Sequence, residues 1–348
     1  MTQVGAPLLA LALAAGVVAA QEAPPAAPPV MHAAAADAVR ESFPAWIDGL
    51  RTEALGRGIS PATLDRALGS LEPLPVVVQR DRAQAEFTLT LDAYLQRRLA
   101  PALVRDTRRA YARERRLLGN VSAAYGVPPH VIAAVWAIES NLGRFSGVRP
   151  TVQSLATLAW DGRRAAFFRE ELFAALAILD RGHIEHERLR GSWAGAMGQP
   201  QFMPSSYLRY AQDFDNDGRR DIWRSLPDVF ASIAFYLKEQ GWEEGVTWGR
   251  EVTVPERAAG AVAAAAPPRV DGCRAAREMS EPLPLERWRE LGVRSLGGTA
   301  LPRADVIGSL VEAGDRRFLV YRNYEALLGY NCAHAYALSV ALLAERLK

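Results

Sequence analysis

The sequence has little of what marks the specialised classes of protein. Its 348 residues include only 2 cysteines, and the 41 basic and 39 acidic side chains leave a formal net charge of +2. So small an excess, without a basic run that contains aromatic residues, gives no support for nucleic-acid binding. Beyond Ala20 no stretch is long and apolar enough to cross a bilayer, so no transmembrane segment is predicted.

What is present is typical of a soluble globular protein. Hydrophobic residues make up 49% of the chain and charged residues 23%, which are ordinary values for packed domains. A chain of 348 residues can bury a large core and is expected to fold as more than one lobe. No internal repeat is visible.

The amino-terminal region lacks any lysine or arginine before Arg40. Residues 1–20 nevertheless combine an Ala/Leu-rich segment with small residues before a cleavage site, which predicts a signal peptide cut after Ala20. Residues 21–37 are predicted to form an Ala/Pro-rich linker. The missing basic residues leave open a weak signal or a misplaced start codon. Because no cysteine (no lipobox) lies near the cleavage site, we expect a soluble periplasmic protein without a lipid anchor.

The rest of the chain divides into four segments by pattern. Residues 38–120 are predicted to form an N-terminal helical lobe, and residues 121–240 the core of the protein. Residues 241–306 contain short β-prone pieces and turns, which predict a small β-containing lobe. Residues 307–348 are predicted to return to helix and to the core. The expected fold class is mainly α (α+β).

The most informative residue is Glu139, which ends the apolar run Val131–Ile138. Pro128 and Pro129 suit the first turn of a helix and Gly143 suits its end, so the run predicts one buried helix with a carboxyl near its C-terminus. Apolar surroundings and the negative end of the helix dipole both disfavour the carboxylate and should raise its pKa. A carboxyl that is protonated near neutral pH is what a general acid requires. The alternative is a helix that ends at a wet surface.

A second segment, Gly191–Tyr207, combines small residues that let a ligand approach the backbone with amide, hydroxyl and aromatic side chains. At these residues the chain resembles the membrane-bound lytic transglycosylase B family, glycoside hydrolase family 103. The resemblance extends from Trp46 to Lys348. The segments that carry it are Gln84–Thr88, Tyr125–Pro128, Ile138–Ser140, Gly195–Gly198, Gln201–Tyr207, Gly241–Trp242 and Tyr330–Asn331.

The resemblance implies a lysozyme-like catalytic core that cleaves the β-1,4 bond between N-acetylmuramic acid and N-acetylglucosamine of peptidoglycan without water. It implies that Glu139 is the single acid and base, which protonates the leaving oxygen and later accepts the proton of the muramyl C6 hydroxyl as a 1,6-anhydro ring closes. Ordinary glycosidases use two carboxyl groups. Glu170 and Glu171 are predicted on a solvated helix face instead. A lone acid is consistent with assistance by the 2-acetamido group of the substrate.

The family's sugar-binding positions fall on polar and aromatic residues of this chain. The substrate-binding residues that the resemblance implies are Tyr94, Ser192, Gln201, Tyr236, Tyr330 and Asn331. Amide and hydroxyl groups can hold N-acetyl groups and ring hydroxyls, and tyrosine offers an apolar face with a polar tip. Tyr94 and Tyr236 have an alternative interpretation as core aromatics.

The acidic segment Asp213–Gly218 has the residue pattern of the first half of a calcium-binding EF-hand loop. Oxygen ligands occupy loop positions 1, 3 and 5 and Gly218 occupies position 6, but Arg224 stands where the usual Glu would be. The family has a longer loop with a later acid. The expected Ca²⁺ ligands are Asp213, Asp215, Asp217, the Arg219 carbonyl and Asp228. The alternative is a polar turn without a metal.

Cys273 and Cys332 are the only cysteines. In the cytosol they would be buried thiols, whereas in an exported chain they can pair, and a disulfide is predicted. The expected partner is the glycan strand of peptidoglycan, bound by a monomer without an organic cofactor. Two alternatives remain open. One is a hydrolytic muramidase on the same fold, and the other is a non-catalytic peptidoglycan-binding protein, which would not need a buried acid.

Overall fold

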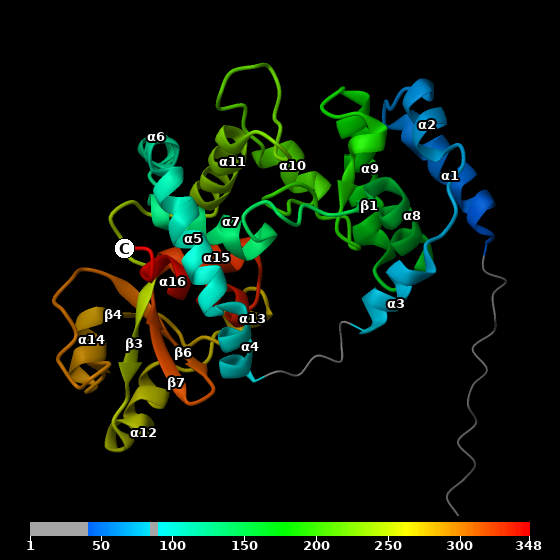
Figure 1. Cartoon of the computed structure of the whole chain (residues 1–348). Coiled ribbons are helices and arrows are strands. Elements are labelled where there is room, and N and C mark those ends of the chain that lie inside the picture. The colour runs from blue at the N-terminus through cyan, green and yellow to red at the C-terminus, as the bar shows by residue number, and fades with distance from the viewer. Residues whose placement is uncertain (1–40, 84–89) are drawn as a thin grey trace, which may run out of the picture. The chain divides into compact units, whose positions relative to one another are not determined.

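A computed structural model (Figure 1) describes residues 41–83 and 90–348. The predicted signal peptide and linker, and the segment Gln84–Thr88, lie outside the described residues. From Ser42 onward the chain forms one unit. Among the described residues no single helix is long and apolar enough to cross a membrane, although two bent pairs of helices reach that length and hydropathy together.

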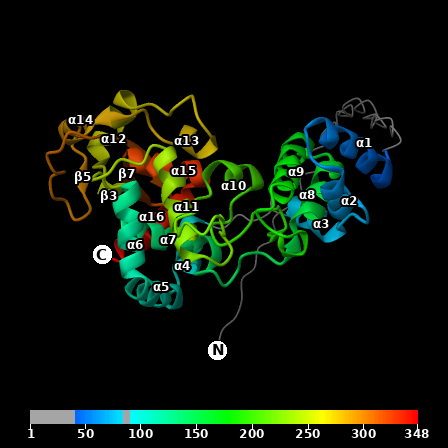
Figure 2. The same ribbon diagram turned by 90° about the horizontal axis from the view of Figure 1, so that it is seen from above.

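One group of helices packs around a hydrophobic cluster that contains Leu155, Phe168 and Tyr207. Its helices are α1 (Phe43–Gly56), α2 (Pro61–Leu68), α3 (Pro75–Ala83), α8 (Thr151–Asp161), α9 (Ala165–Asp180) and α10 (Pro204–Tyr210). The side chains of Ser42 and Ser60 cap α1 and α2, and a proline occupies the first turn of each. Helices α8 and α9 lie side by side, next to α1, α2 and α3, in both views (Figures 1 and 2).

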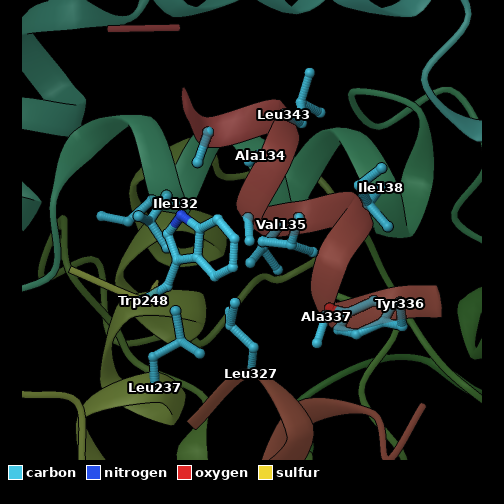
Figure 3. Packing of buried hydrophobic residues seen from close by; sticks show 14 of the residues in the cluster. Ile132, Ala134, Val135, Ile138, Leu237, Trp248, Leu327, Tyr336, Ala337 and Leu343 are labelled. Atoms are coloured by element: carbon cyan, nitrogen blue, oxygen red, sulfur yellow. The ribbon is translucent and has the colours of Figure 1, made fainter. Parts of the chain in front are cut away.

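A second group of helices surrounds α7 (Pro129–Ser140). The helices that share its core are α4 (Leu91–Arg98), α5 (Pro101–Arg113), α6 (Arg115–Tyr125), α11 (Leu226–Glu239), α15 (Arg322–Tyr330) and α16 (His334–Glu345). Figure 3 shows Ile132, Val135 and Ile138 of α7 in the same apolar core as Leu327 and Leu343. A helix that is apolar on all sides is stable only when it is buried on all sides, which explains the central position of α7.

A five-stranded antiparallel sheet in the order β4-β6-β7-β3-β5 forms the third part of the fold. Its strands are β3 (Gly249–Thr253), β4 (Leu283–Pro284), β5 (Arg294–Ser295), β6 (Ile307–Ala313) and β7 (Arg316–Val320), and the helices near it in sequence are α12 (Glu256–Ala265), α13 (Arg274–Arg277) and α14 (Leu285–Glu290). Leu310 and Leu319, paired across β6 and β7, pack in a small cluster with Trp288. Val311 and Phe318, the next pair, belong to the core around α7. Alternate residues therefore bury both faces of the sheet.

The prediction that residues 307–348 return to helix is wrong for their first part. Ile307–Ala313 and Arg316–Val320 form the central hairpin of the sheet, and helix begins only at Arg322. The hairpin is rich in β-branched and aromatic residues that alternate between two buried faces. That period of two indicates strand, and the helical interpretation overlooked it.

The two neighbouring acids of α9 differ in their surroundings. Glu170 is exposed and pairs with Arg57 at 2.7 Å, as expected for a solvated helix face. The same prediction is wrong for Glu171, which is buried and accepts hydrogen bonds from the backbone N–H and the hydroxyl of Ser205, at 2.9 and 2.6 Å. Because Ser205 lies in the first turn of α10, the Glu171 carboxylate satisfies a free N–H at that helix end.

Candidate active site

Glu139 lies in the last turn of α7, after an unbroken run of buried residues from Val131 to Ile138. Burial raises the pKa of Glu139 from its ordinary value of 4.5 to about 7. The Tyr336 hydroxyl and the charge of Arg98 lower the pKa, but by less than burial raises it. The side chain keeps some exposure to solvent. At neutral pH, therefore, a large fraction of the molecules carries a protonated carboxyl that a ligand can reach.

The helix ends sooner than predicted, in a run of three left-handed residues. Asn141, Leu142 and Gly143 have φ values of 50°, 62° and 79°. Such a conformation is costly for a bulky leucine and persists only where the surroundings enforce it. The Ser140 hydroxyl contributes to this, since it donates to the Trp136 carbonyl at 3.2 Å and accepts the N–H of Gly143 at 3.1 Å. The carboxyl is thus followed directly by a strained, hydrogen-bonded helix end.

Gln201 lies in a tight turn formed by residues 198–201. The backbones of Met197 and Phe202 exchange hydrogen bonds of 2.7 and 3.0 Å, which close the turn. Gln201 is left-handed, with φ 53°, and its side-chain amide donates to the Gly198 carbonyl at 2.8 Å. Its side-chain oxygen accepts no hydrogen bond from the part of the chain that the structure describes, so it is available to a ligand.

Tyrosines from three helices gather around Glu139. The ring centroids of Tyr236 and Tyr330 are 4.5 Å apart, and those of Tyr330 and Tyr336 are 6.1 Å apart. Burial is the largest cause that raises the pKa of each of the three hydroxyls, and the charge of Glu139 raises it further. That shared influence places all three hydroxyls near the carboxyl. The Tyr330 hydroxyl also donates to the Pro200 carbonyl at 2.7 Å, which attaches the turn of Gln201 to α15.

The structure gives each of the three other predicted binding residues its own surroundings. The Ser192 hydroxyl accepts the N–H groups of Ala194 and Ala196 at 3.3 and 3.1 Å, so it shapes the Gly-rich loop and keeps its own hydrogen free to donate. Asn331 is exposed and ends α15. Tyr94, on α4, is half-buried and lines a hollow of about 610 Å³. The residues that line this hollow do not include Glu139.

Two residues beside Glu139 were missed by sequence reasoning. Tyr336 is buried in α16, and its hydroxyl makes no hydrogen bond of normal geometry within the described residues, yet it stabilises the charged form of Glu139. A tyrosine in an aliphatic helix was the available signal, because a buried hydroxyl needs a partner. Arg98 donates to the Ile138 carbonyl, which holds its charge near the acid. No sequence signal marked Arg98.

The acidic loop, residues 213–228, begins with three carboxylates from Asp213, Asp215 and Asp217. One oxygen of each lies within 4.8 Å of those of the other two. Because this limit is about twice a Ca²⁺–oxygen bond of roughly 2.4 Å, one ion fits between them. Backbone N–H groups of the loop donate to these carboxylates, and the Ser225 hydroxyl donates to Asp215 at 2.8 Å. Carboxylate oxygens are the type of ligand that Ca²⁺ binds in proteins.

Asp228 is not one of the three residues whose oxygens lie within 4.8 Å of one another. It is buried in the first turn of α11, where its two oxygens accept the backbone N–H groups of Phe214 and Asp221, each at 2.8 Å. Burial raises its pKa, and these two hydrogen bonds lower it. The backbone N–H of Arg219 donates to Asp217 at 2.8 Å. Asp228 therefore attaches Phe214 and Asp221 of the acidic loop to the start of α11.

Cys273 and Cys332 form a disulfide in the structure, the pairing that the sequence predicts. Their Cα atoms are 6.3 Å apart and 59 residues separate them in sequence. The Cys332 sulfur also accepts the N–H of Ala275 at 3.3 Å. Because Cys332 follows Tyr330 and Asn331, the disulfide attaches this side of the site covalently to the start of α13.

Comparisons with known proteins give consistent results. A family model described as the transglycosylase SLT domain matches residues 42–345. Membrane-bound lytic murein transglycosylase B of Escherichia coli (strain K12) is 40% identical over 129 residues, which are 37% of this chain and 36% of that protein. This alignment thus spans only about a third of the relative's length.

Solved structures match over more of the chain. SltB3 from Pseudomonas aeruginosa, in complex with NAG-anhNAM-pentapeptide, is 41% identical with a TM-score of 0.81, and the match covers 88% of this chain and 80% of that chain. Escherichia coli Slt35 in complex with calcium is 24% identical with a TM-score of 0.69, covering 88% of this chain and 92% of that chain, a likeness that concerns the fold alone. These neighbours confirm the predicted mainly α fold with a lysozyme-like core and a small sheet.

Proposed function

The chain belongs to the transglycosylase SLT domain family, and from that premise we propose that it is a lytic transglycosylase. It cleaves the β-1,4 bond between N-acetylmuramic acid and N-acetylglucosamine of peptidoglycan and leaves 1,6-anhydromuramyl products. SltB3 was solved with NAG-anhNAM-pentapeptide and with NAG-NAM-pentapeptide, which supports this substrate class. The observation that carries the proposal is a single accessible carboxyl, Glu139, whose burial raises its pKa to about 7.

Glu139 acts twice in the proposed reaction. As the bond between C1 of the muramyl residue and the glycosidic oxygen breaks, the carboxyl donates its proton to that oxygen. The C6 hydroxyl oxygen then forms a bond to C1, and its proton passes to the Glu139 carboxylate, which is restored to its first state. A pKa near the working pH favours both transfers. Between them, Tyr336 and Arg98 stabilise the carboxylate, since both lower its pKa.

The lone carboxyl favours attack by the substrate's own hydroxyl over attack by water. Ordinary glycosidases place two carboxyl groups roughly 5 to 9.5 Å apart, and the second serves as nucleophile or activates water. A second charged carboxylate at such a distance would raise the pKa of Glu139. The causes that shift the pKa of Glu139 among the described residues are burial, Tyr336 and Arg98, and none of them is a carboxylate. This supports the transglycosylase over the hydrolytic muramidase.

The sugar-binding roles are proposed on the positions of the polar groups. Tyr236 and Tyr330 offer ring faces and edges beside Glu139, and Gln201 offers a free side-chain oxygen. Ser192 has a hydroxyl hydrogen free to donate, Asn331 directly follows Tyr330 and is exposed, and Tyr94 on α4 lines a hollow of its own. Removing the Gln201 amide is expected to raise KM more than it lowers kcat, because this side chain holds the substrate and moves no proton.

The experiment that tests the proposal is digestion of purified sacculi, with the products compared before and after borohydride reduction. Anhydromuramyl products are one water lighter than reducing-end products and take up no hydride. Glu139→Gln should yield no products, since it keeps the shape of the side chain and removes its proton. Products that borohydride reduces would identify a muramidase instead. Binding of sacculi without any cleavage by the unaltered protein would identify a binding protein.

The acidic loop is proposed to bind Ca²⁺ through Asp213, Asp215 and Asp217, with the Arg219 carbonyl as a further ligand. Support comes from the three carboxylates, each of which places one oxygen within 4.8 Å of the others. When bound, the ion would neutralise their mutual repulsion and order the loop, which serves stability and not proton transfer. Asp228 is proposed to contribute by closing the loop. Export to the periplasm through residues 1–20, and action as a monomer, remain proposals as well.

A further inference from the structure

The turn that presents Gln201 contains a second glutamine, Gln199, to which the reaction described above gives no part. Its side chain is buried, with 8% of the residue exposed. The indole N–H of Trp136 donates to its side-chain oxygen at 2.7 Å, and its side-chain N–H₂ donates to the Trp223 carbonyl at 2.9 Å. Its backbone N–H donates to the Ile222 carbonyl at 2.9 Å. One residue thus joins α7, the turn of residues 198–201 and the acidic loop.

The contact with Trp136 reaches the helix that carries the acid. Trp136 precedes Glu139 by three residues, so the two side chains leave α7 on neighbouring faces. The indole is buried and packs edge-on against Phe230 of α11, with ring centroids 5.1 Å apart. Its N–H has one partner within the described residues, the Gln199 oxygen. Gln199 therefore holds α7 at the turn from which Glu139 projects.

Gln199 also packs against the strained end of α7. A Cβ atom built on Gly143 would lie 2.4 Å from the Gln199 side-chain oxygen, so a larger residue here would displace the Gln199 amide. Gly143 is the last of the three left-handed residues that follow Ser140. Strained backbone persists only where neighbours enforce it. The Gln199 amide is one such neighbour, and removing it gives the helix end room to relax.

The same amide fixes the turn itself. Gln201 follows Gln199 by two residues and is left-handed, with φ 53°. Between them, the Pro200 carbonyl accepts the Tyr330 hydroxyl at 2.7 Å. The turn is therefore held to α15 through Pro200 and to α7 through Gln199, and the direction of the Gln201 side chain depends on both attachments.

We propose that Gln199 is a positioning residue, whose amide holds the Glu139 end of α7 and the Gln201 turn in register and keeps water from the base of the acid. The inference rests on the proposed function, because it assumes that Glu139 transfers the proton. Gln199 acts through Trp136 and Gly143, without a contact to the reacting atoms. Small displacements of a catalytic group cost up to about 100-fold in rate, so loss of this amide is expected to act on kcat.

The experiment compares Gln199→Met with the matched variant Gln212→Met on soluble glycan strands. Each change replaces a buried or half-buried amide by an apolar side chain of similar length. Gln212 stands beside the acidic loop and bonds to the Tyr125 hydroxyl and the Ala211 carbonyl, at 3.3 and 3.2 Å, away from α7. Gln199→Met is expected to lower kcat between about 10- and 100-fold, with a smaller rise in KM because the Gln201 turn loses one of its two attachments. Gln212→Met should lower the melting temperature and leave kcat unchanged.

The pH profile of kcat separates positioning from stability. Charged and titratable groups face Glu139 from four helices: Arg98 from α4, Tyr236 from α11, Tyr330 from α15 and Tyr336 from α16. None of them changes in Gln199→Met. If water then reaches the acid, burial raises its pKa less, and the alkaline limb of the profile moves to lower pH. A loss of stability alone would leave that limb where it was.

A second variant keeps the inference testable if Gln199→Met does not fold. Trp136→Phe keeps a six-membered aromatic ring but loses the five-membered ring of the indole, with the N–H that Gln199 accepts. It should shift the same limb in the same direction. A folded variant at either position with the unaltered kcat and pH profile would overturn the inference. Retained activity in Glu139→Gln would instead overturn the proposed function, so the two failures are distinguishable.

Discussion

Glu139→Gln is expected to stabilise the folded protein at alkaline pH and to leave its stability unchanged at acid pH. Burial raises the pKa of Glu139 from 4.5 to about 7, so the folded state binds this proton more tightly than the unfolded chain does. Below pH 4.5 both states are protonated. As the pH rises toward 7, only the unfolded chain loses the proton, and the free energy of unfolding falls. Above about 7 that loss is complete.

The magnitude follows from the two pKa values. At about 1.4 kcal/mol for each tenfold change in an ionisation constant, a pKa of about 7 in place of 4.5 corresponds to about 3 kcal/mol. The Glu139 side chain keeps partial exposure, and solvent screening reduces the cost of its charge. Glutamine has nearly the same shape and never ionises. We therefore expect Glu139→Gln to gain about 2 kcal/mol of unfolding free energy near pH 8.

The assay is urea unfolding of both proteins near pH 4 and near pH 8, followed by circular dichroism. Glu170→Gln is the matched control on another helix. Hydrogen bonding to Arg57 lowers the pKa of Glu170, so its replacement should give no gain at alkaline pH. Equal stability of Glu139→Gln and the unaltered protein near pH 8 would refute the reasoning, since the carboxylate would then be as well solvated in the folded state as in the unfolded one.

Three further predictions concern the surroundings of the acid. Tyr336→Phe removes a hydroxyl that lowers the pKa of Glu139, so the alkaline limb of the kcat profile should move to higher pH, and a move to lower pH would contradict this. Replacing Cys273 and Cys332 by serine should lower the melting temperature, because closing a loop of 59 residues contributes about 4 kcal/mol in the chain-entropy model; two alkylated thiols in native, unreduced protein would show that no bond forms. Calcium should raise the melting temperature, since a ligand of the folded state alone stabilises it, and Asp217→Ala should remove most of that rise; the same melting temperature in chelator and in calcium would make the loop a plain acidic turn.

Glu139 could be singled out from the sequence because the pattern that marks it lies within one segment. An apolar run interrupted by a single carboxyl predicts a buried helix with a perturbed pKa, and α7 with Glu139 has both properties. Tyr336 and Arg98 carry no comparable signal. Their importance comes from packing between α4, α7 and α16, which are far apart in sequence, and single-sequence patterns contain no such pairing.

The errors have local causes of a different kind. The hairpin of β6 and β7 follows a long Ala/Pro-rich and turn-rich stretch, and its strands are apolar enough to be taken for buried helix. Short apolar runs are ambiguous between strand and buried helix. Glu171 was expected on a solvated helix face, but it is buried and its oxygens accept the N–H and the hydroxyl of Ser205. Spacing along the sequence indicates which positions a side chain can reach. The hydrogen bonds that buried polar groups require decide where the side chain points.

Because α16 packs against α7, Glu139 can keep its proton near neutral pH only in the folded protein. Glu139 acquires its raised pKa only from burial, to which the packing of α16 against α7 contributes, and this is a contact between distant parts of the chain. In a chain still without this contact, a hydrated carboxyl would have its ordinary pKa of 4.5, and at pH 7 roughly one molecule in several hundred would hold the proton. Newly made or damaged copies would therefore be chemically inert toward peptidoglycan, without an inhibitor or a propeptide to restrain them.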